Sequence, residues 1–261
     1  MMIKNKLNNL TGKEWVKFTK SWMIHNPPRR GNKKVLHPAC FPETLVQEFI
    51  EFFTKKDQIV LDVFVGTGST LVACDRSKRK GIGIELIKKY YNIAKKRTKQ
   101  KIILGDARDL DKMNLPEIHF CISSPPYWNM LRKSRGNNHT TSKKRIKNGL
   151  DVYYSDDKRD LGNIDDYEEY LNNLYDIFKK VHGVLKDGAY LVIIIQNVRT
   201  PSGEMKPLAW DLAKKLSKFF VLKQEKIWCQ DNKFLGCWGY PSEYVSNVHH
   251  HYCLIFKKVS M

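Results

Sequence analysis

Residues 121–129 read CISSPPYWN and bring hydroxyls, two prolines and two aromatic rings into one short stretch. The residues before them, EIHFCI at 117–122, have the apolar character of a buried strand. Because proline cannot extend a central sheet, the strand must stop at the two prolines. A strand that ends in a rigid, aromatic and hydroxyl-bearing turn indicates a functional site at its carboxyl end.

A second candidate site lies in DVFVGTGST at 62–70, which belongs to another apolar run. Gly66 and Gly68 permit a tight turn that brings the backbone close to a ligand. Glu85 ends the next predicted strand, 17 residues after Gly68, where a carboxylate can accept hydrogen bonds from ribose hydroxyls. Leu71 stands where the dinucleotide fingerprint has its third glycine. The pattern favours a nucleoside-bearing cofactor, and a purely structural turn is the alternative.

Two further acids extend this cofactor hypothesis. Asp62 lies four residues before Gly66 at the end of its strand, where a carboxylate can hold the ammonium group of an amino acid. That placement suits S-adenosyl-L-methionine better than a pyrophosphate cofactor. Asp106 follows the apolar run KIILG and can accept a hydrogen bond from the exocyclic amine of an adenine ring.

Alternating strands and helices must position these residues. Strands are predicted at 58–64, 81–86, 101–106, 117–122, 189–195, 220–229 and 250–258, and helices at 69–77, 87–97, 165–185 and 206–219. The alternation predicts an α/β fold, with a mostly parallel seven-stranded sheet and helices on both faces. The last two strands follow each other without a helix, so we expect an antiparallel C-terminal pair. We expect a single domain over 1–261.

With these motifs in this order, the chain resembles the amino-methylating DNA methyltransferases, which modify cytosine N4 or adenine N6. HPACFPETLVQEFI at 37–50 resembles the family's cofactor-pocket segment, and DVFVGTGST resembles its methionine-binding loop. SPPY at 124–127 resembles its catalytic tetrad of Asp, Asn or Ser followed by Pro-Pro-aromatic. The resemblance spans about residues 35–258 and implies the Rossmann-like fold of S-adenosyl-L-methionine-dependent methyltransferases. The residues that it assigns to the cofactor are Phe41, Asp62, Phe64, Gly66, Thr67, Gly68, Ser69, Thr70, Glu85, Asp106 and Ala107.

The resemblance assigns catalysis to the tetrad Ser124, Pro125, Pro126 and Tyr127. An exocyclic base amine is a poor nucleophile because its lone pair is delocalised into the ring. The Ser124 hydroxyl and a backbone carbonyl near the prolines can accept its two N–H bonds and aim the nitrogen at a methyl group. Tyr127 offers a flat face for a base that has left the duplex stack.

The base and the nucleic acid follow from the same resemblance. Serine at the first tetrad position goes more often with cytosine N4 in this family, and aspartate more often with adenine N6. We therefore expect a site-specific DNA cytosine-N4 methyltransferase, with adenine-N6 and RNA methylation as alternatives. A non-catalytic nucleic-acid-binding module is the alternative from another class. Carbon-5 methylation is disfavoured, because it usually needs a Pro-Cys dipeptide and none of the six cysteines follows a proline.

Charge indicates a polyanionic partner. The chain carries 46 Lys and Arg against 27 Asp and Glu, a formal net charge of +19. Residues 129–148 hold seven of these cations and no acid. The cations expected to contact DNA phosphates are Arg132, Lys133, Arg135, Lys143, Lys144, Arg145 and Lys147. Since no separate recognition domain is evident, the insertion 129–163 and the loop 230–247 are the candidate recognition elements. A companion restriction endonuclease that acts on the same sequence is a further candidate partner.

Cysteine usage and hydropathy indicate a reduced, cytoplasmic protein. No CxxC pair or signal peptide is evident, and the longest apolar run, AYLVIII at 189–195, is too short to span a bilayer. Cys229, Cys237, Cys253 and the histidines at 249–251 match no usual zinc spacing, so we expect no metal site.

Overall fold

A computed structural model of the chain describes residues 5–26, 41–129, 151, 153–200, 202–233, 235–237 and 240–259. Its helices are α1 (Gly12–Phe18), α2 (Glu43–Phe53), α3 (Ser69–Ser77), α4 (Lys88–Arg97), α7 (Tyr167–Val184) and α8 (Leu208–Leu216), with short 3₁₀ helices η1 (Ala107–Lys112) and η2 (Leu161–Asn163). Its strands are β1 (Trp22–Ile24), β2 (Ile59–Asp62), β3 (Lys80–Glu85), β4 (Lys101–Leu104), β5 (Ile118–Ser123), β6 (Leu185–Ile195), β7 (Val198–Arg199), β8 (Met205–Lys206), β9 (Val221–Cys229) and β10 (His250–Lys257).

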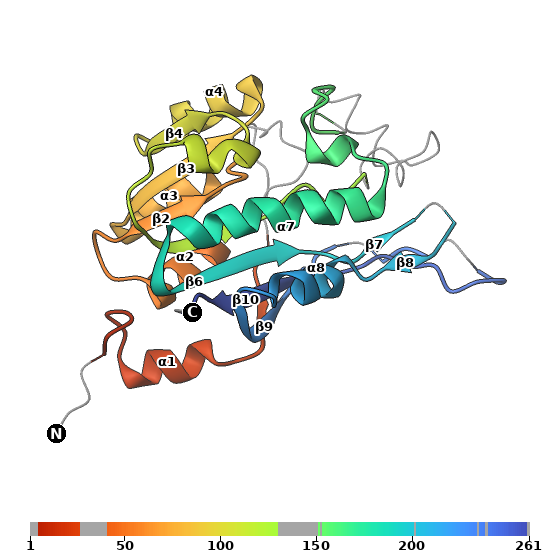
Figure 1. The fold of residues 1–261 in the computed structure, drawn as a ribbon. Coiled ribbons are helices and arrows are strands. Elements are labelled where there is room, and N and C mark those ends of the chain that lie inside the picture. Colours follow the sequence, from red (N-terminus) through yellow and green to blue (C-terminus); the bar gives the residue numbers. More distant parts are fainter. Residues whose placement is uncertain are drawn as a thin grey trace.

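Eight strands of the described residues form one sheet, in the order β1-β9-β10-β6-β5-β2-β3-β4 (Figure 1). β10 runs antiparallel to both of its neighbours, β6 and β9, and the other adjacent pairs are parallel. The α/β fold and the antiparallel C-terminal pair are therefore confirmed. The sheet has one strand more than the seven predicted, because β1 joins it at β9. β1 has only three residues and is too short to show a strand pattern in the sequence.

The strand order brings the predicted site residues to one edge of the sheet. β2 ends at Asp62, β3 at Glu85 and β5 at Ser123. β10 runs the other way, so its first residues, His250 and His251, lie at the same edge. The chain progresses outward from β2 to β3 and β4 and then returns to β5 on the other side of β2. Such a reversal is where open α/β sheets bind their ligands.

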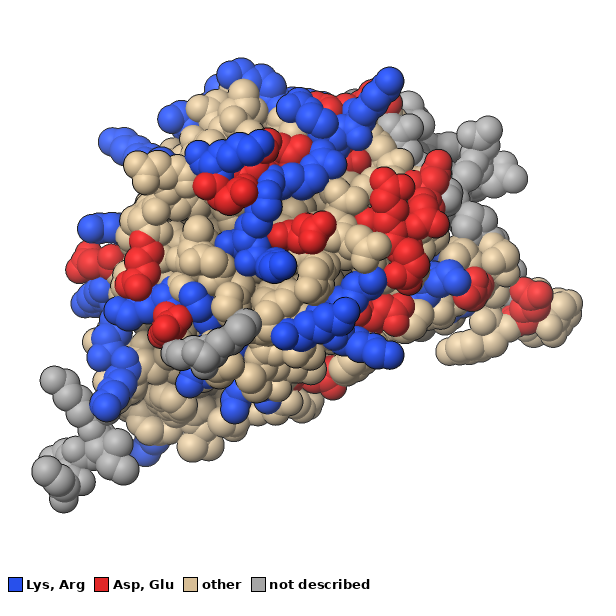
Figure 2. All heavy atoms as spheres, viewed as in Figure 1, with Lys and Arg blue, Asp and Glu red and all other residues tan. Residues whose placement is uncertain are grey.

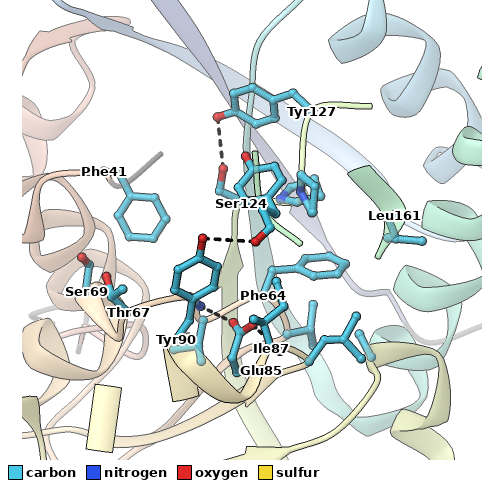
Figure 3. A pocket seen from close by; sticks show the side chains of 18 of the residues that line it. Phe41, Phe64, Thr67, Ser69, Glu85, Ile87, Tyr90, Ser124, Tyr127 and Leu161 are labelled. Carbon is cyan, nitrogen blue, oxygen red and sulfur yellow. Dashed lines mark hydrogen bonds between the residues drawn. The ribbon is translucent and has the colours of Figure 1, made fainter. Parts of the chain in front are cut away.

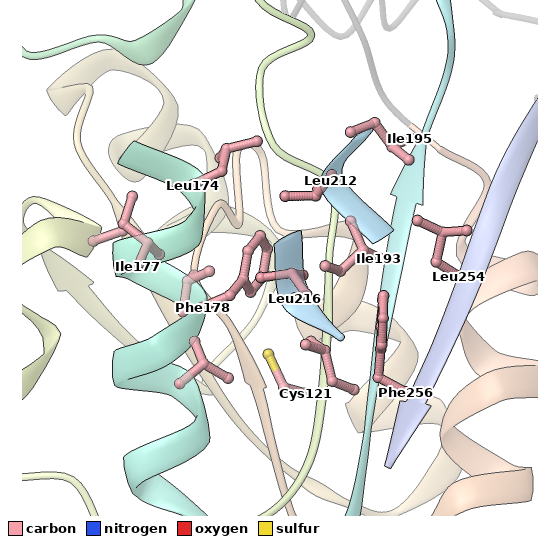
Figure 4. Close-up of a cluster of buried hydrophobic side chains, with 14 of the residues drawn as sticks. Cys121, Leu174, Ile177, Phe178, Ile193, Ile195, Leu212, Leu216, Leu254 and Phe256 are labelled. Atoms are coloured by element: carbon pink, nitrogen blue, oxygen red, sulfur yellow. The ribbon is translucent and has the colours of Figure 1, made fainter. Parts of the chain in front are cut away.

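Helices cover both faces of the sheet. α7 and α8 pack on the face that is in front in Figure 1, and α2 and α3 pack on the other. Figure 4 shows the front core, where Phe178 of α7 and Leu216 of α8 lie against Ile193 of β6 and Phe256 of β10. Both cores are built from side chains of strands and helices together, so the position of each strand end is well defined.

α7 and β6 meet without a loop, which differs from the prediction. Asp166 caps the helix by accepting a hydrogen bond from the backbone N–H of Glu169 at 2.7 Å. β6 begins directly after the helix, at Leu185, whereas a strand was predicted only from 189. Leu185 is paired with Ile118 of β5, and Gly188 N donates to Lys258 O at 3.2 Å. Pairing across the sheet therefore sets the start of β6, and a local apolar pattern does not reveal it.

The positive charge is widely distributed. Figure 2 shows Lys and Arg side chains over most of the face that carries α7 and α8, with Asp and Glu between them. On this face the excess charge therefore does not form one continuous stripe. Of the helices in the described residues, none is long and apolar enough to cross a membrane.

Candidate active site

A cavity of about 440 Å³ lies at the carboxyl edge of the sheet, between the glycine loop (62–70) and the tetrad. Its size is typical of a small-molecule site. In Figure 3, Glu85 and Ile87 lie at one end of the view and Ser124 and Tyr127 at the other, with Phe64 between them. The lining residues are Phe41, residues 63–67, Ser69, residues 84–87, Tyr90, residues 105–107 and 124–127, Tyr154, residues 159–161, Gln196, Trp228, Gln230, Asn232, Lys233 and His251.

The glycine loop joins β2 to α3 and depends on left-handed backbone. Gly66 and Gly68 have φ angles of 53° and 88°, a region that glycine adopts without steric cost. A Cβ at position 68 would lie 3.1 Å from the Cβ of Ala94 in α4, so the loop packs closely on that helix. Gly68 and Thr70 do not line the cavity. The predicted loop residues that do line it are Phe64, Gly66, Thr67 and Ser69.

Strand β3 compensates for the missing third glycine of the fingerprint. Leu71 of α3 is fully buried, and a Cβ at Gly81 of β3 would lie 2.7 Å from its Cδ2. A Cβ at Gly83 would lie 2.7 Å from Cγ2 of Val65 in the loop. The close approach of helix, loop and sheet therefore rests on two strand glycines, whose role the sequence analysis missed.

Asp62, predicted to hold an ammonium group, is not among the residues that line the cavity. Its fully buried carboxylate accepts hydrogen bonds from Phe64 N at 3.0 Å, Thr70 Oγ1 at 2.5 Å and Ser123 Oγ at 2.5 Å. Burial raises the pKa of Asp62, and the three donors oppose that rise. Asp62 therefore ties the glycine loop to β5.

The first serine of SSPPYW has a structural role that sequence analysis missed. Ser123 is fully buried, donates to Asp62 and accepts a hydrogen bond from Phe64 N at 3.2 Å. It thus connects the end of β2 to the strand that carries the tetrad. The two serines have different tasks, because Ser123 joins the motifs whereas Ser124 lines the cavity.

Glu85 lies where a ribose contact was predicted. Glu85 is 7% exposed and belongs to the cavity wall, and its carboxylate accepts hydrogen bonds from Gly66 N and Ile87 N, both at 2.8 Å. A carboxylate has about four acceptor positions, so hydroxyl groups of a ligand can still bond to it. Burial raises the pKa of Glu85 to about 7, although the two backbone donors act against that rise.

Asp106 and Ala107, which were predicted to bind the cofactor, line the cavity on the β4 side. Asp106 caps η1 by accepting a hydrogen bond from Arg108 N at 2.9 Å, and its side chain forms an ion pair with the Arg108 guanidinium at 2.7 Å. Arg108 also donates to Arg159 O at 2.6 Å. An adenine amine at this position therefore has to share the carboxylate with Arg108.

Phe41, predicted to lie at the cofactor, is half-buried and lines the cavity. Figure 3 shows its ring on the same side as Thr67 and Ser69 of the glycine loop. The ring also packs against the core beneath α2, the helix that follows it in the chain. The segment before α2 thus supplies an aromatic wall to the cofactor side.

Within the tetrad, Ser124 and Tyr127 are hydrogen-bonded to each other. Ser124 is half-buried, and its Oγ lies 3.1 Å from the phenol oxygen of Tyr127 (Figure 3). Tyr127 is 8% exposed and donates to Ile194 O at 3.5 Å. Burial raises the pKa of Tyr127, so its phenol stays protonated at neutral pH. Besides its predicted ring face, Tyr127 therefore has a hydroxyl that helps to fix Ser124.

The two proline carbonyls differ in their partners. Pro126 O accepts hydrogen bonds from Trp128 N at 3.0 Å and from the phenol of Tyr170. No donor to Pro125 O is present among the described residues. The carbonyl directly after Ser124 is therefore the one with acceptor capacity for a ligand.

The wall next to the tetrad comes from the C-terminal strands, which sequence analysis did not assign to the site. Trp228 lies near the end of β9, Gln196 follows β6, and His251 is the second residue of β10. The rings of Trp228 and His251 stack with centroids 4.5 Å apart, and His251 lies 5.8 Å from Tyr127. The histidines at 249–251 were considered only as metal ligands, because the sequence does not show that β10 lies between β6 and β9.

The seven cations predicted to contact DNA, within 132–147, lie outside the described residues. Described parts of both candidate recognition elements contribute to the cavity wall. From 129–163 the cavity is lined by Tyr154 and residues 159–161, and from 230–247 by Gln230, Asn232 and Lys233. The buried Asp160 stabilises the first element by accepting hydrogen bonds from Gly162 N and Ser155 Oγ, both at 2.9 Å.

The cofactor side of the cavity fits S-adenosyl-L-methionine. Glu85 has acceptor positions left for ribose hydroxyls, and Ile84, Ile87 and Ala107 provide apolar wall for an adenine ring. The left-handed Gly66 keeps the loop backbone free of a side chain where a ligand approaches. In the described part of the chain no group of three or more His, Cys, Asp or Glu could hold a metal ion.

A family model described as DNA methylase, for N6 and N4 methyltransferases, matches residues 3–96 and 118–260. The matched ranges include the glycine loop, Glu85 and the tetrad, and they leave out Asp106 and Ala107. The match therefore covers both sides of the cavity.

Individual relatives are similar over shorter stretches. The orphan methyltransferase M.BamHII of Bacillus amyloliquefaciens is 32% identical over 120 residues, which is 45% of this chain and 45% of that protein. The type II methyltransferase M.BglI of Bacillus subtilis is 37% identical over 89 residues, which is 34% of this chain and 25% of that protein. The matched stretches thus span less than half the length of these relatives. Among solved structures, TrmN from Thermus thermophilus has a TM-score of 0.51 at 12% identity, covering 83% of this chain and 48% of that one, which shows a shared fold alone.

Proposed function

The chain belongs to the DNA methylase family of amino-methylating methyltransferases, and on that premise we propose that it transfers a methyl group from S-adenosyl-L-methionine to the N4 amine of cytosine in DNA. One observation carries the proposal: Glu85, from the cofactor motifs, and Ser124, from the tetrad, line the same cavity. Methyl transfer needs its two reactants to meet in one site, and the strand reversal beside β2 provides that site.

The cofactor side would be formed by Phe41, Glu85, Asp106 and the glycine loop. S-adenosyl-L-methionine is the methyl donor that the family and the fold imply, and when bound it supplies an electrophilic methyl group on its sulfonium sulfur. Glu85 would accept hydrogen bonds from the ribose, and Phe41 would give an apolar face. Asp62 and Ser123 hold the loop in place from behind, so their contribution is to position the loop backbone.

The tetrad would hold the target amine. The Ser124 hydroxyl has two acceptor lone pairs, so it can accept one N–H of the amine while Tyr127 remains bonded to it. Pro125 O is the acceptor for the second N–H, because Pro126 O is occupied by Trp128 and Tyr170. Neither a serine hydroxyl nor a protonated phenol is a base of useful strength. The gain in rate therefore comes from orientation and preorganised acceptors.

Cytosine is preferred over adenine on the identity of Ser124 alone. An adenine N6 amine presents the same two N–H bonds to the same two acceptors, so adenine-N6 methylation is the second candidate. RNA methylation is a third candidate, because the proposed acceptors of the tetrad would bond to the base amine, which DNA and RNA share.

The same proposal assigns DNA binding to the insertion 129–163 and the loop 230–247 of a single methyltransferase domain. Its supports are the net charge of +19 and the contribution of both elements to the cavity wall. Relatives named as type II methyltransferases make a companion restriction endonuclease for the same DNA sequence a candidate partner.

The test is to identify the methylated nucleoside. The protein is incubated with DNA, and in parallel with RNA, together with isotopically labelled S-adenosyl-L-methionine, and the products are digested and analysed by mass. N4-methylcytosine in DNA is expected. N6-methyladenine would favour the second candidate, and label in RNA alone the third. Label in no nucleoside, or at carbon 5 of cytosine, would contradict an amino-methylating enzyme.

The Ser124→Ala variant tests the tetrad within this experiment. Loss of one preorganised hydrogen-bonding group should lower the single-turnover rate roughly 100-fold, with unchanged cofactor affinity. Ser217→Ala is the control, because Ser217 is an exposed serine at the end of α8 that does not line the cavity. Equal rates in the two variants would remove Ser124 from the mechanism.

A further inference from the structure

One polar side chain in the cavity wall lacks a hydrogen-bond partner among the described residues. His251 is 9% exposed and lines the cavity, and its Nδ1 is buried without a partner. The other buried side-chain atoms that lack a partner in the described part of the chain belong to residues outside the cavity wall. Buried polar groups without partners are rare in folded proteins, and a role at a functional site is one explanation for them.

The imidazole is held rigidly, so a loose side chain does not account for the missing partner. Its ring stacks on Trp228 with centroids 4.5 Å apart and an interplanar angle of 25°. Trp228 is itself fixed, because its Nε1 donates to His25 O at 2.7 Å. On the backbone side, Gln196 Nε2 donates to His250 O at 2.7 Å. The protein therefore presents a preorganised polar ring to the cavity.

His251 also lies beside the tetrad. Its ring centroid is 5.8 Å from that of Tyr127, whose hydroxyl lies 3.1 Å from Ser124 Oγ. An amine held at Ser124 and Pro125 would place the Watson–Crick edge of its base in this part of the cavity. The next polar atom along that edge is N3 in cytosine and N1 in adenine. Both are ring nitrogens that accept hydrogen bonds, and flipped bases are recognised through this edge.

The charge state of His251 suits such an acceptor. Burial, with smaller contributions from Lys233 and His250, lowers the pKa of His251 to about 3. The imidazole is therefore neutral at physiological pH and carries one N–H donor. We propose that His251 is a specificity-determining residue that donates this N–H to the ring nitrogen beside the target amine. The inference rests on the proposed methyl transfer to a base amine.

The test combines a protein change with a base change. Single-turnover methylation is measured for wild type, His251→Phe and His251→Asn on DNA that carries cytosine or 3-deazacytosine at the target, or adenine and 1-deazaadenine if adenine is the base. The deaza bases replace the ring nitrogen by C–H. His251→Phe keeps a ring against Trp228 and should lower the rate on the natural base about three- to tenfold, as expected for one neutral hydrogen bond. His251→Asn keeps a donor and should recover part of that loss.

The rate losses caused by His251→Phe and by the deaza base should not multiply when the two changes are combined. On the deaza base, wild type and His251→Phe should react at similar rates, because the hydrogen bond is already absent. His250→Phe is the matched control: its side chain is not part of the cavity wall, and it should behave like wild type on both substrates. Cofactor affinity by calorimetry and thermal melting should be the same in all variants, which excludes a general loss of structure.

Two results would overturn the assignment of His251. One is an unchanged rate for both His251 variants on the natural base, and the other is the same fold loss for His251→Phe on natural and deaza bases. In either case wild-type methylation would leave the proposed function standing. If wild type methylates neither base, the proposed function fails and the inference fails with it.

Discussion

Neighbouring residues at the carboxyl edge of the sheet perform different tasks. Ser123 is buried and joins the two motifs through Asp62, whereas Ser124 faces the cavity and is bonded to Tyr127. Glu85 combines both kinds of task, because it holds the backbone of Gly66 and still has acceptor positions toward the cavity. A side chain next to the reactive group therefore need not touch a substrate to be necessary for the site.

The hydroxyl of Tyr127 should matter apart from its ring. In Tyr127→Phe the bond to Ser124 Oγ is lost, and the single-turnover rate should fall about three- to tenfold. Tyr127→Ala should also weaken capture of the flipped base by about 1–3 kcal/mol, as base–aromatic stacking does elsewhere. Rates are measured with a fluorescent base analogue at the target to report flipping. Normal turnover in both variants would show that Tyr127 is only part of a rigid turn.

Glu85 should give protein stability a pH dependence. Its pKa is about 7 in the folded protein and 4.5 when exposed, so the folded state favours the protonated form. The cost of burying the ionised carboxylate is absent below pH 4.5, grows as the pH rises, and levels off above about pH 7 at about 3 kcal/mol. Compared with wild type, Glu85→Gln should therefore become relatively more stable across this range.

The measurement for Glu85 is the free energy of unfolding in urea, for wild type and Glu85→Gln, at several pH values between 4.5 and above 7. Asp62 is also buried with a raised pKa, and its charge contributes to the raised pKa of Glu85, so it is kept unchanged in both proteins. A difference that does not change with pH would show that Glu85 titrates normally.

The packing of α3 and the glycine loop on β3 depends on two glycines of that strand. Gly81 lies under Leu71 of α3, and Gly83 lies under Val65 of the glycine loop. These contacts set how deeply the loop sits over the sheet, and therefore where Phe64 and Gly66 enter the cavity. The element that fixes the cofactor side is thus the strand beneath the loop as much as the loop itself.

Gly81→Ala should destabilise the protein by about 1–3 kcal/mol through overpacking against Leu71. Leu71→Val removes the Cδ2 atom that the new methyl group would meet. In that background Gly81→Ala should therefore cost less stability than in wild type. Gly183→Ala in α7 is the control, because no atom lies within 4 Å of its Cβ position. It should be neutral or stabilising by up to about 1 kcal/mol. Unfolding in urea measures wild type, the two single variants, the double variant and the Gly183→Ala control, and a fully additive pair would argue against the contact.

A net charge of +19 attracts the whole molecule to DNA. The effect of this overall charge has to be distinguished from phosphate contacts made by one particular segment. Cations are spread over the face seen in Figure 2 rather than gathered at one place. The segment 129–148 is distinguished by its sequence position directly after the tetrad. A test must therefore compare two variants that lose the same number of positive charges, one within this segment and one elsewhere on the surface.

Neutralising the seven cations of 132–147 should weaken DNA binding and flatten its salt dependence. Each lost phosphate contact lowers the slope of log affinity against log salt by about 0.9 for duplex DNA, so the slope should fall by up to about 6. The control neutralises seven exposed lysines that flank the amino ends of β2, β3 and β4, on the opposite edge from the cavity. These are Lys56, Lys78, Lys80, Lys95, Lys96, Lys99 and Lys101. Equal slopes in the two variants would mean that the segment is no phosphate clamp.

The sequence by itself determined the α/β fold, the glycine turn and the place of the tetrad. These features are local, because apolar period, left-handed glycine and the missing N–H of proline act within a few residues. The three-residue β1 and the start of β6 at Leu185 escaped prediction, since each is defined by pairing with a distant strand.

Only the tertiary structure decided which of the predicted residues face the cavity. Asp62 was expected there but is turned to Ser123, 61 residues away in the chain, because β2 and β5 are neighbours in the sheet. His251 was not expected there, yet the antiparallel course of β10 between β6 and β9 brings it beside Tyr127. Hydrogen-bond partners and burial depend on strand order, and strand order is set by the competition of all strands for one sheet. That is why no local stretch of the sequence contains this information.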